Sequence, residues 1–307
     1  MIKVLITGAS GFVGSNLLNF LREKGYVVST LTRKRNATYN YDTITPEILN
    51  NYDSLIHLAA KSHDLKKTSN EDEYFQVNTE LTRQIFDNYL KSTCKQFIYF
   101  SSVKAVADNV DEKELLETHP YEPLTPYGKS KAQAEQHLLK QKLPENQQLY
   151  ILRPCMIHGP GNKGNLNLLY TFISKGIPYP FGEFDNKRSF LSMNNLQYVI
   201  HHIVTNKVAP DIYNLADDES LSTNDIVTLI ATSLNTKPKI LSVPKTIISA
   251  IARIGNILPL PINTEKMQKL TENYCVSNEK IKAALGVKKL PLSSSDGLIN
   301  TFKSFLK

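Results

Sequence analysis

A glycine-rich turn near the start of the chain constrains the fold more than any other feature of the sequence. Residues 7–14 read TGASGFVG and overlap the end of an apolar segment, KVLITG, at residues 3–8. Glycines at this spacing permit a tight turn, close approach of a pyrophosphate and close packing of a helix on a strand. Backbone N–H groups at the start of the following helix can bind an anion. The turn therefore predicts a dinucleotide site formed by Gly8, Ser10, Gly11, Phe12, Val13 and Gly14.

Strand-like and helix-like segments alternate through the first half of the chain. Further apolar segments occur at residues 27–32, 53–60, 96–102 and 149–154, and residues 38–41 suggest one more short strand. This alternation predicts an α/β fold, with a parallel sheet covered by helices on both faces. After about residue 160 the regularity loosens, and we expect a smaller lobe interleaved with the last strands.

Composition narrows the class of protein. The 307 residues are 41% hydrophobic and 21% charged, as in an ordinary globular protein, and no apolar run is long enough to span a membrane. The chain begins directly on a strand-like segment, which leaves no room for a signal peptide. Cys94, Cys155 and Cys275 lack paired spacing and indicate free thiols in a reducing cytoplasm.

The net charge of +7 is scattered along the chain. Small basic clusters, such as residues 33–35, do not interleave with aromatic residues as a nucleic-acid surface would. We therefore expect a solvated basic surface and no nucleic-acid partner, while a small anionic substrate stays open.

A tyrosine and a lysine four residues apart form a second notable pattern, within PYGKSKAQAE at residues 126–135. Pro126 suits the first position of a helix, on which Tyr127 and Lys131 share one face. A fixed ammonium beside a phenol stabilises the phenolate and lowers the pKa of the phenol. The pair is a candidate for passing a proton to or from an alcohol oxygen, although a surface tyrosine beside a lysine has the same spacing.

Six motifs now stand in a characteristic order: TGASGFVG, HLAA at 57–60, VN at 77–78, FSS at 100–102, YGKSK at 127–131 and LRP at 152–154. This order resembles the extended short-chain dehydrogenase/reductase superfamily, in its NAD-dependent epimerase/dehydratase branch of nucleotide-sugar enzymes. The resemblance implies a Rossmann-type doubly wound parallel sheet in residues 1–165. It also implies a smaller substrate-binding lobe, mainly in residues 166–307, with the last sheet strand near 211–216 returning to the first domain.

The resemblance also implies roles for individual residues. Tyr127 matches the catalytic acid/base, and Lys131 matches its partner, which also holds the nicotinamide ribose. Ser102 takes the place of the third catalytic residue, with Ser101 as the alternative. Further cofactor contacts are implied for Leu58, Ala59, Ala60, Asn78 and Pro154.

The choice of cofactor depends on the end of the second strand. A carboxylate there binds the ribose 2′-OH of NAD, but residues 32–35 read TRKR and hold no acid. A guanidinium can accept a 2′-phosphate, so Arg33 favours NADP(H). A solvated basic loop beside an NAD(H) site is the alternative.

Departures from the family pattern narrow the reaction. Residues 101–108 read SSVKAVAD, without the acidic pair of the 4,6-dehydratases and without the tyrosine of close UDP-galactose 4-epimerases. The segment instead resembles UDP-4-keto-6-deoxy-hexosamine reductases. Residues 186–196, NKRSFLSMNNL, resemble the family's diphosphate-binding segment, with Asn195 in place of the usual aspartate. The resemblance implies substrate contacts from Lys104, Asn165 and Arg188.

We therefore predict a reductase that transfers hydride from NAD(P)H to C4 of a nucleotide-linked 4-keto-6-deoxy sugar, in the synthesis of surface polysaccharide precursors. A UDP-hexose 4-epimerase and a non-catalytic dinucleotide-sensing regulator are the alternatives. No metal site is expected, because the histidines lack ligand spacing. The oligomeric state stays open, a homodimer included.

Overall fold

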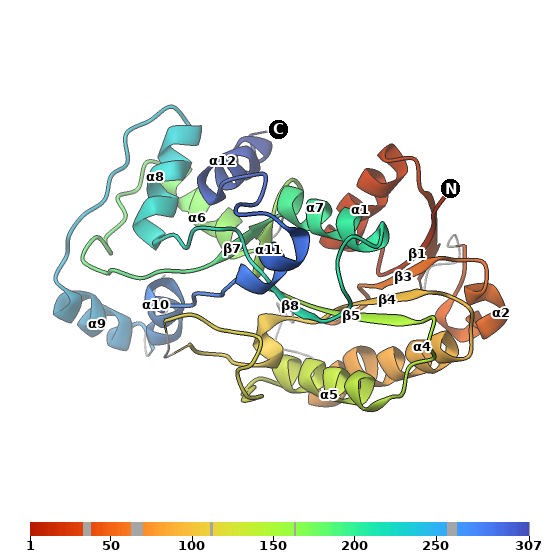
Figure 1. Ribbon diagram of the computed structural model, residues 1–307. Helices are drawn as coiled ribbons and strands as arrows, with labels where there is room; N and C mark the ends of the chain where they lie inside the picture. Colours follow the sequence, from red (N-terminus) through yellow and green to blue (C-terminus); the bar gives the residue numbers. More distant parts are fainter. Residues whose placement is uncertain (33–37, 63–69, 111–112, 163, 257–262, 307) are drawn as a thin grey trace.

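A six-stranded parallel sheet forms the centre of the computed structural model, which describes residues 1–32, 38–62, 70–110, 113–162, 164–256 and 263–306 (Figure 1). The strand order is β2-β1-β3-β4-β5-β8, and every neighbouring pair is parallel. This arrangement confirms the expected α/β fold. The strands are β1 (Lys3–Thr7), β2 (Val27–Leu31), β3 (Ser54–His57), β4 (Gln96–Phe100), β5 (Gln148–Pro154) and β8 (Ile212–Leu215).

Helices cover both faces of this sheet. In Figure 1, α1 (Phe12–Glu23), α7 (Met193–Val204) and α11 (Glu279–Leu285) lie above it, and α4 (Leu81–Leu90) and α5 (Pro126–Lys140) lie below it. The strands are apolar on both sides: Val4 and Ile6 pack in the core under α1 and α7, whereas Leu5 packs in the core over α4 and α5. A sheet buried on two faces requires such continuous apolar runs.

The expected strand at residues 38–41 is not formed. Only Tyr39 pairs with the sheet, through an isolated bridge to Leu31, and a 3₁₀ turn follows at Tyr41–Thr43. The side chains and backbones of Asn40 and Thr43 exchange capping hydrogen bonds that turn the chain away. A short polar cap here overrides the strand preference of the neighbouring tyrosines.

The second half of the chain also builds a smaller group of elements beside the sheet, at the left of Figure 1. A two-stranded parallel ribbon pairs β6 (Met156–His158) with β7 (Phe190–Ser192). The group also contains α6 (Asn165–Ser174), α8 (Thr223–Ser233), α9 (Lys245–Ile254), α10 (Thr264–Thr271) and α12 (Ser294–Ser304). The division of the chain at residues 165 and 166 stays a prediction.

Short segments connect the first half. They are α2 (Pro46–Leu49), α3 (Glu71–Phe75), a π-helical turn at Gln76–Glu80 and a 3₁₀ turn at Val103–Ala105. In the described part of the chain, no helix combines the length and the apolar character needed to span a bilayer.

Candidate active site

The start of α5 is held in place by capping side chains. The Thr125 hydroxyl accepts a hydrogen bond from the Gly128 N–H (3.2 Å), and Asp108 Oδ2 accepts from the N–H groups of Leu124 and Thr125 (2.7 and 3.0 Å). Pro126 occupies the first helical turn, where its missing N–H costs no hydrogen bond. These contacts fix the direction in which Tyr127 leaves the helix.

Gly128 lets this helix lie directly against the loop that carries Ser102. A Cβ added at Gly128 would lie 2.4 Å from the carbonyl oxygen of Lys104, so only glycine allows this approach. Ser102 follows β4 and caps the 3₁₀ turn, where its hydroxyl accepts from the Lys104 N–H (3.2 Å). The structure thus brings Ser102 close enough to Tyr127 for its hydroxyl to favour the phenolate and lower the pKa of the phenol.

The side chain of Tyr127 is half-buried, and burial of its phenol raises the pKa above the usual 10.0, while the Ser102 hydroxyl opposes this shift. The sequence led us to expect the opposite direction, a pKa lowered by Lys131. The expectation fails because desolvation of the phenolate outweighs the other influences at this position. Tyr127 is therefore held as a phenol, the protonated form needed to donate to a carbonyl oxygen.

The ammonium group of Lys131 points into the protein. It is almost fully buried, donates to the Phe100 carbonyl oxygen (2.7 Å) and lies 4.7 Å from the ring centre of Tyr99. Burial lowers the pKa of Lys131 to about 7, and the negative charge of Glu135 opposes this shift. A desolvated cation of this kind is strongly disposed to contact a further polar group.

The structure contains a buried ion pair near Lys131 that we did not predict from the sequence. Glu135 Oε2 accepts from Arg153 Nη2 (2.6 Å) and from the Tyr121 hydroxyl (2.8 Å), and the Ser101 hydroxyl donates to Oε1 of the same carboxylate. Ser101 is thus engaged in this network, which favours Ser102 as the residue that faces a substrate. Glu135 could have been found from its position four residues after Lys131, on the same helix face.

The glycines of the turn meet two different requirements, packing within the chain and open space at the start of α1. Gly8 has φ +69°, and added Cβ atoms at Gly8 and Gly14 would lie 2.8 Å from Ala59 N and 2.3 Å from Gly8 O. At Gly11 the nearest such atom is 3.4 Å away. Gly8 and Gly14 are therefore required by packing within the chain, whereas Gly11 keeps space open over the first turn of α1.

The first turn of α1 fits an anionic group. It contains no acidic residue, and no side chain caps it, because Gly11 is the N-cap residue. Its backbone N–H groups and the positive end of the helix dipole favour a phosphate. Of the other predicted residues in this turn, Ser10 is exposed and Phe12 and Val13 are half-buried.

His57 has a structural role. The Thr7 hydroxyl accepts two backbone N–H groups and therefore donates to His57 Nδ1 (2.8 Å), which places the ring proton on Nε2, facing Thr82 Oγ1 (2.9 Å). Thr82 in turn donates to the carbonyl oxygen of Asn78 (2.8 Å). Burial lowers the pKa of His57 to about 3, so the ring stays neutral. Among the described residues, no group of three or more His, Cys, Asp or Glu could hold a metal ion.

The remaining predicted cofactor residues lie around the ends of the central strands. The N–H groups of Leu58 and Ala59 donate to Thr7 Oγ1 (3.0 Å each). Asn78 is buried and binds the backbone of Lys61 on both sides (2.8 and 3.0 Å). Ala60 is exposed, Pro154 ends β5 in a buried position, and Arg33 lies outside the described residues.

Two of the predicted substrate residues meet at Tyr274. The ammonium of Lys104 donates to the Asp108 carbonyl oxygen (2.7 Å) and lies 4.2 Å from the ring centre of Tyr274. The backbone of Arg188 pairs with Tyr274, and Arg188 Nη2 lies 3.4 Å from Glu272 Oε1. Asn165 is the exposed first residue of α6 and has no contact with either cation in the hydrogen bonds described.

Asn195 has a structural role in the second half of the chain, where it joins separate segments by hydrogen bonds. It is fully buried, and its Nδ2 donates to Asp217 Oδ1 (2.7 Å) and to the Leu292 carbonyl oxygen (2.8 Å). The carboxylate expected at this position is supplied instead by Asp217, which also accepts from the Ser192 N–H (2.9 Å).

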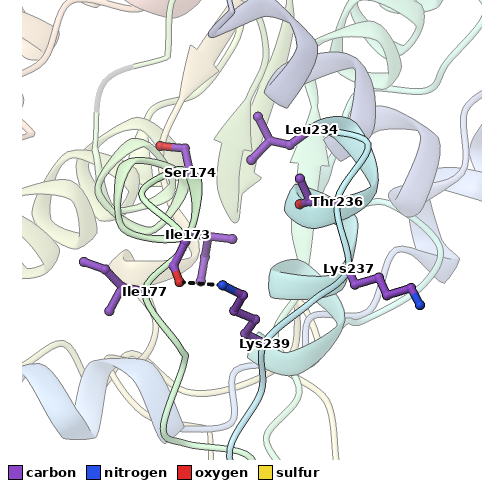
Figure 2. A pocket seen from close by; sticks show the side chains of 8 residues that line it. Ile173, Ser174, Ile177, Leu234, Thr236, Lys237 and Lys239 are labelled. Carbon is purple, nitrogen blue, oxygen red and sulfur yellow. Dashed lines mark hydrogen bonds between the residues drawn. The ribbon is translucent and has the colours of Figure 1, made fainter.

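A hollow of about 320 Å³ opens elsewhere on the surface, between the end of α6 and the segment after α8 (Figure 2). None of the predicted site residues lines it. Figure 2 shows Lys239 turned toward α6, where its ammonium donates to the Gly176 carbonyl oxygen (3.3 Å). We assign this hollow no part in the reaction.

Comparison with known proteins agrees with this geometry. The model of the family described as "NAD dependent epimerase/dehydratase family" matches residues 4–216. A UDP-glucose 4-epimerase of Vibrio cholerae is 30% identical over 99% of this chain and 96% of its own. A UDP-2-acetamido-2,6-beta-L-arabino-hexul-4-ose reductase of Pseudomonas aeruginosa is 30% identical over 54% of this chain and 38% of its own.

Among solved structures, the UDP-N-acetylglucosamine 4-epimerase of Bacillus cereus superposes with a TM-score of 0.76 over 100% of both chains, at 17% identity. This likeness shows the shared fold, including the lobe beside the sheet.

Proposed function

The chain belongs to the NAD-dependent epimerase/dehydratase family, and from this premise we propose that it reduces C4 of a nucleotide-linked 4-keto-6-deoxy sugar. A reduced nicotinamide cofactor, when bound, would supply the hydride for the carbonyl carbon. Tyr127 donates the proton to the carbonyl oxygen, so the products are the C4 alcohol and the oxidised cofactor. Ser102 holds that oxygen beside the phenol.

The main support for a reductase, as opposed to a 4,6-dehydratase, comes from the segment after Ser102. Val103 is buried, and the ammonium of Lys104 is held by the Asp108 carbonyl oxygen and the Tyr274 ring. Neither residue is an acid that could perform an elimination, as the acids of 4,6-dehydratases do. The similarity to the Pseudomonas aeruginosa reductase supports the same reaction.

A 4-epimerase acting on a UDP-hexose is the second candidate. It is favoured by the Vibrio cholerae relative, which matches nearly the whole chain. The same Ser102, Tyr127 and Lys131 would serve, because an epimerase removes and returns hydride at C4. A non-catalytic regulator has less support, since the chain retains the tyrosine–lysine pair.

For the cofactor, we propose NADP(H), on the basis of Arg33 and the absence of an acid in residues 32–35. Arg33→Asp should lower the ratio of kcat/KM for NADPH over NADH. An unchanged ratio would return the choice to NAD(H), unless Arg35 proved responsible. A cytoplasmic location and a homodimer stay predictions.

One assay separates the two reactions. The purified protein is given NADPH or NADH with a panel of nucleotide-linked 4-keto-6-deoxy hexoses and, in parallel, UDP-hexoses without added cofactor. A reductase oxidises one reduced cofactor for each ketosugar consumed. Conversion of a UDP-hexose without net cofactor oxidation would instead establish the epimerase, and inactivity in both arms would contradict both.

A further inference from the structure

Helix α9 exposes a continuous apolar stripe. Ile247, Ala250, Ile251 and Ile254 follow the i, i+3, i+4, i+7 spacing of one helix face, and the three isoleucines are 50%, 41% and 50% exposed. The opposite face anchors the helix, because Ile248 packs in a buried cluster with Tyr179, Phe181 and Val227. The stripe is therefore held outward by a fixed helix and has no cover among the described residues.

The segment that carries this stripe has charges of one sign. Residues 226–264 contain no Asp or Glu, whereas Lys237, Lys239, Lys245 and Arg253 all lie in this range. All four cations are exposed, and none takes part in an ion pair in the described part of the chain. An acid-free segment of this length is unusual in a chain that is 21% charged.

We propose that this face of α9 docks on the surface of a bilayer that contains anionic lipids. An exposed apolar stripe on a segment whose charges are all positive is typical of a helix that lies in the plane of a membrane interface. The isoleucines would enter the boundary between head groups and acyl chains, Arg253 beside the stripe would contact a lipid phosphate, and the other exposed cations would be attracted to the anionic surface. With 10 residues, α9 is too short to span the bilayer and can only lie on it.

A second copy of the chain is a poorer occupant. A symmetric dimer through α9 would place the same cations of two copies against each other, and the acid-free segment offers no counter-charge. An anionic lipid surface supplies that charge and the apolar phase together.

The position of α9 also suits docking. The helix lies at one end of the molecule with α10 beside it, at the lower left of Figure 1, and away from α1 and the start of the sheet. The C-terminal end of α10 leads directly to Glu272, which pairs with Arg188. A docked enzyme would therefore turn the Arg188 side of the site toward the membrane, whichever reaction it catalyses.

Vesicle sedimentation tests the proposal with the full-length protein. Vesicles of phosphatidylcholine mixed with phosphatidylglycerol should bind it, and pure phosphatidylcholine should bind it much more weakly. The variant I247S/I251S/I254S should bind the mixed vesicles at least about tenfold more weakly. K245E/R253E should also lose about tenfold or more, and added salt should weaken wild-type binding.

The matched control is L116S/L139S/L306S, which removes three other exposed apolar side chains outside α9. It should bind as the wild type does, and all variants should share the wild-type circular dichroism and unfolding midpoint. Absence of vesicle binding, equal binding by the isoleucine variant, or binding indifferent to the charge reversal would overturn the proposal. The proposal would also be overturned if the wild-type protein formed dimers and did not bind vesicles, while the isoleucine variant was monomeric.

Discussion

Lys131 Nζ donates a hydrogen bond to the carbonyl oxygen of Phe100 over 2.7 Å and joins α5 to the end of β4. This bond holds a buried ammonium group one helical turn from Tyr127. Because burial lowers the pKa of Lys131 to about 7, the charge at the site changes within the neutral range. The phenol of Tyr127 does not change its charge in this range, since burial raises its pKa.

The pH dependence of reduction should follow from these two shifts. Below about pH 7 the ammonium is present and the phenol can donate its proton, so kcat/KM should be highest there. As the pH rises through the pKa of Lys131, the ammonium is lost and kcat/KM should fall, although Tyr127 stays protonated. A profile that is flat from about pH 6 to about pH 9 would show that the free enzyme does not use this charge.

The glycine turn gives a paired test of cofactor binding. In Gly11→Ala the new methyl group meets nothing closer than 3.4 Å, so the protein should fold normally. The methyl group would occupy the space over α1, and the affinity for NADPH or NADH should fall about tenfold or more. Fluorescence titration measures that affinity.

Gly14→Ala is the contrasting variant. Its methyl group would lie 2.3 Å from Gly8 O, so backbone atoms must move. We expect it to lower the free energy of unfolding by about 1–3 kcal/mol, as overpacking does, in urea titration. Wild-type cofactor affinity in Gly11→Ala would mean that no phosphate approaches this turn.

Arg188 separates substrate binding from chemistry. If its guanidinium holds the substrate diphosphate, Arg188→Ala should raise KM for the sugar nucleotide about tenfold to a hundredfold and change kcat little. Glu272→Ala is the matched control, because it removes the 3.4 Å partner and leaves the guanidinium in place. Equal defects in both variants would indicate that the ion pair matters only for structure. A normal KM with a collapsed kcat would also contradict the diphosphate role.

Local sequence patterns were enough to predict the sheet, the glycine turn and the helix face shared by Tyr127 and Lys131. Each depends on spacing within one element or on one strand followed by one helix. The Glu135–Arg153 ion pair joins α5 to β5, and spacing alone could indicate only its first member. The direction of the Tyr127 pKa depends on burial by the whole fold, which no short motif contains.

The sequence also did not show when a residue distant along the chain supplies an expected side chain. Asn195 stands where an aspartate was expected, and its partner Asp217 follows β8, in a separate part of the sequence. At Asn40 and Thr43 the error has a local cause, because their capping hydrogen bonds outweighed the apolar pattern of a strand.

The most direct test of the account is the turnover of Tyr127→Phe, which removes only the hydroxyl that should donate a proton at C4. We expect kcat for the natural reaction to fall about 10²–10⁴-fold. Cofactor affinity and the unfolding midpoint should stay close to those of the wild type, because the ring and its packing are retained. Turnover within about twofold of the wild type, measured with saturating substrate and cofactor, would contradict the assignment of Tyr127 as the proton donor.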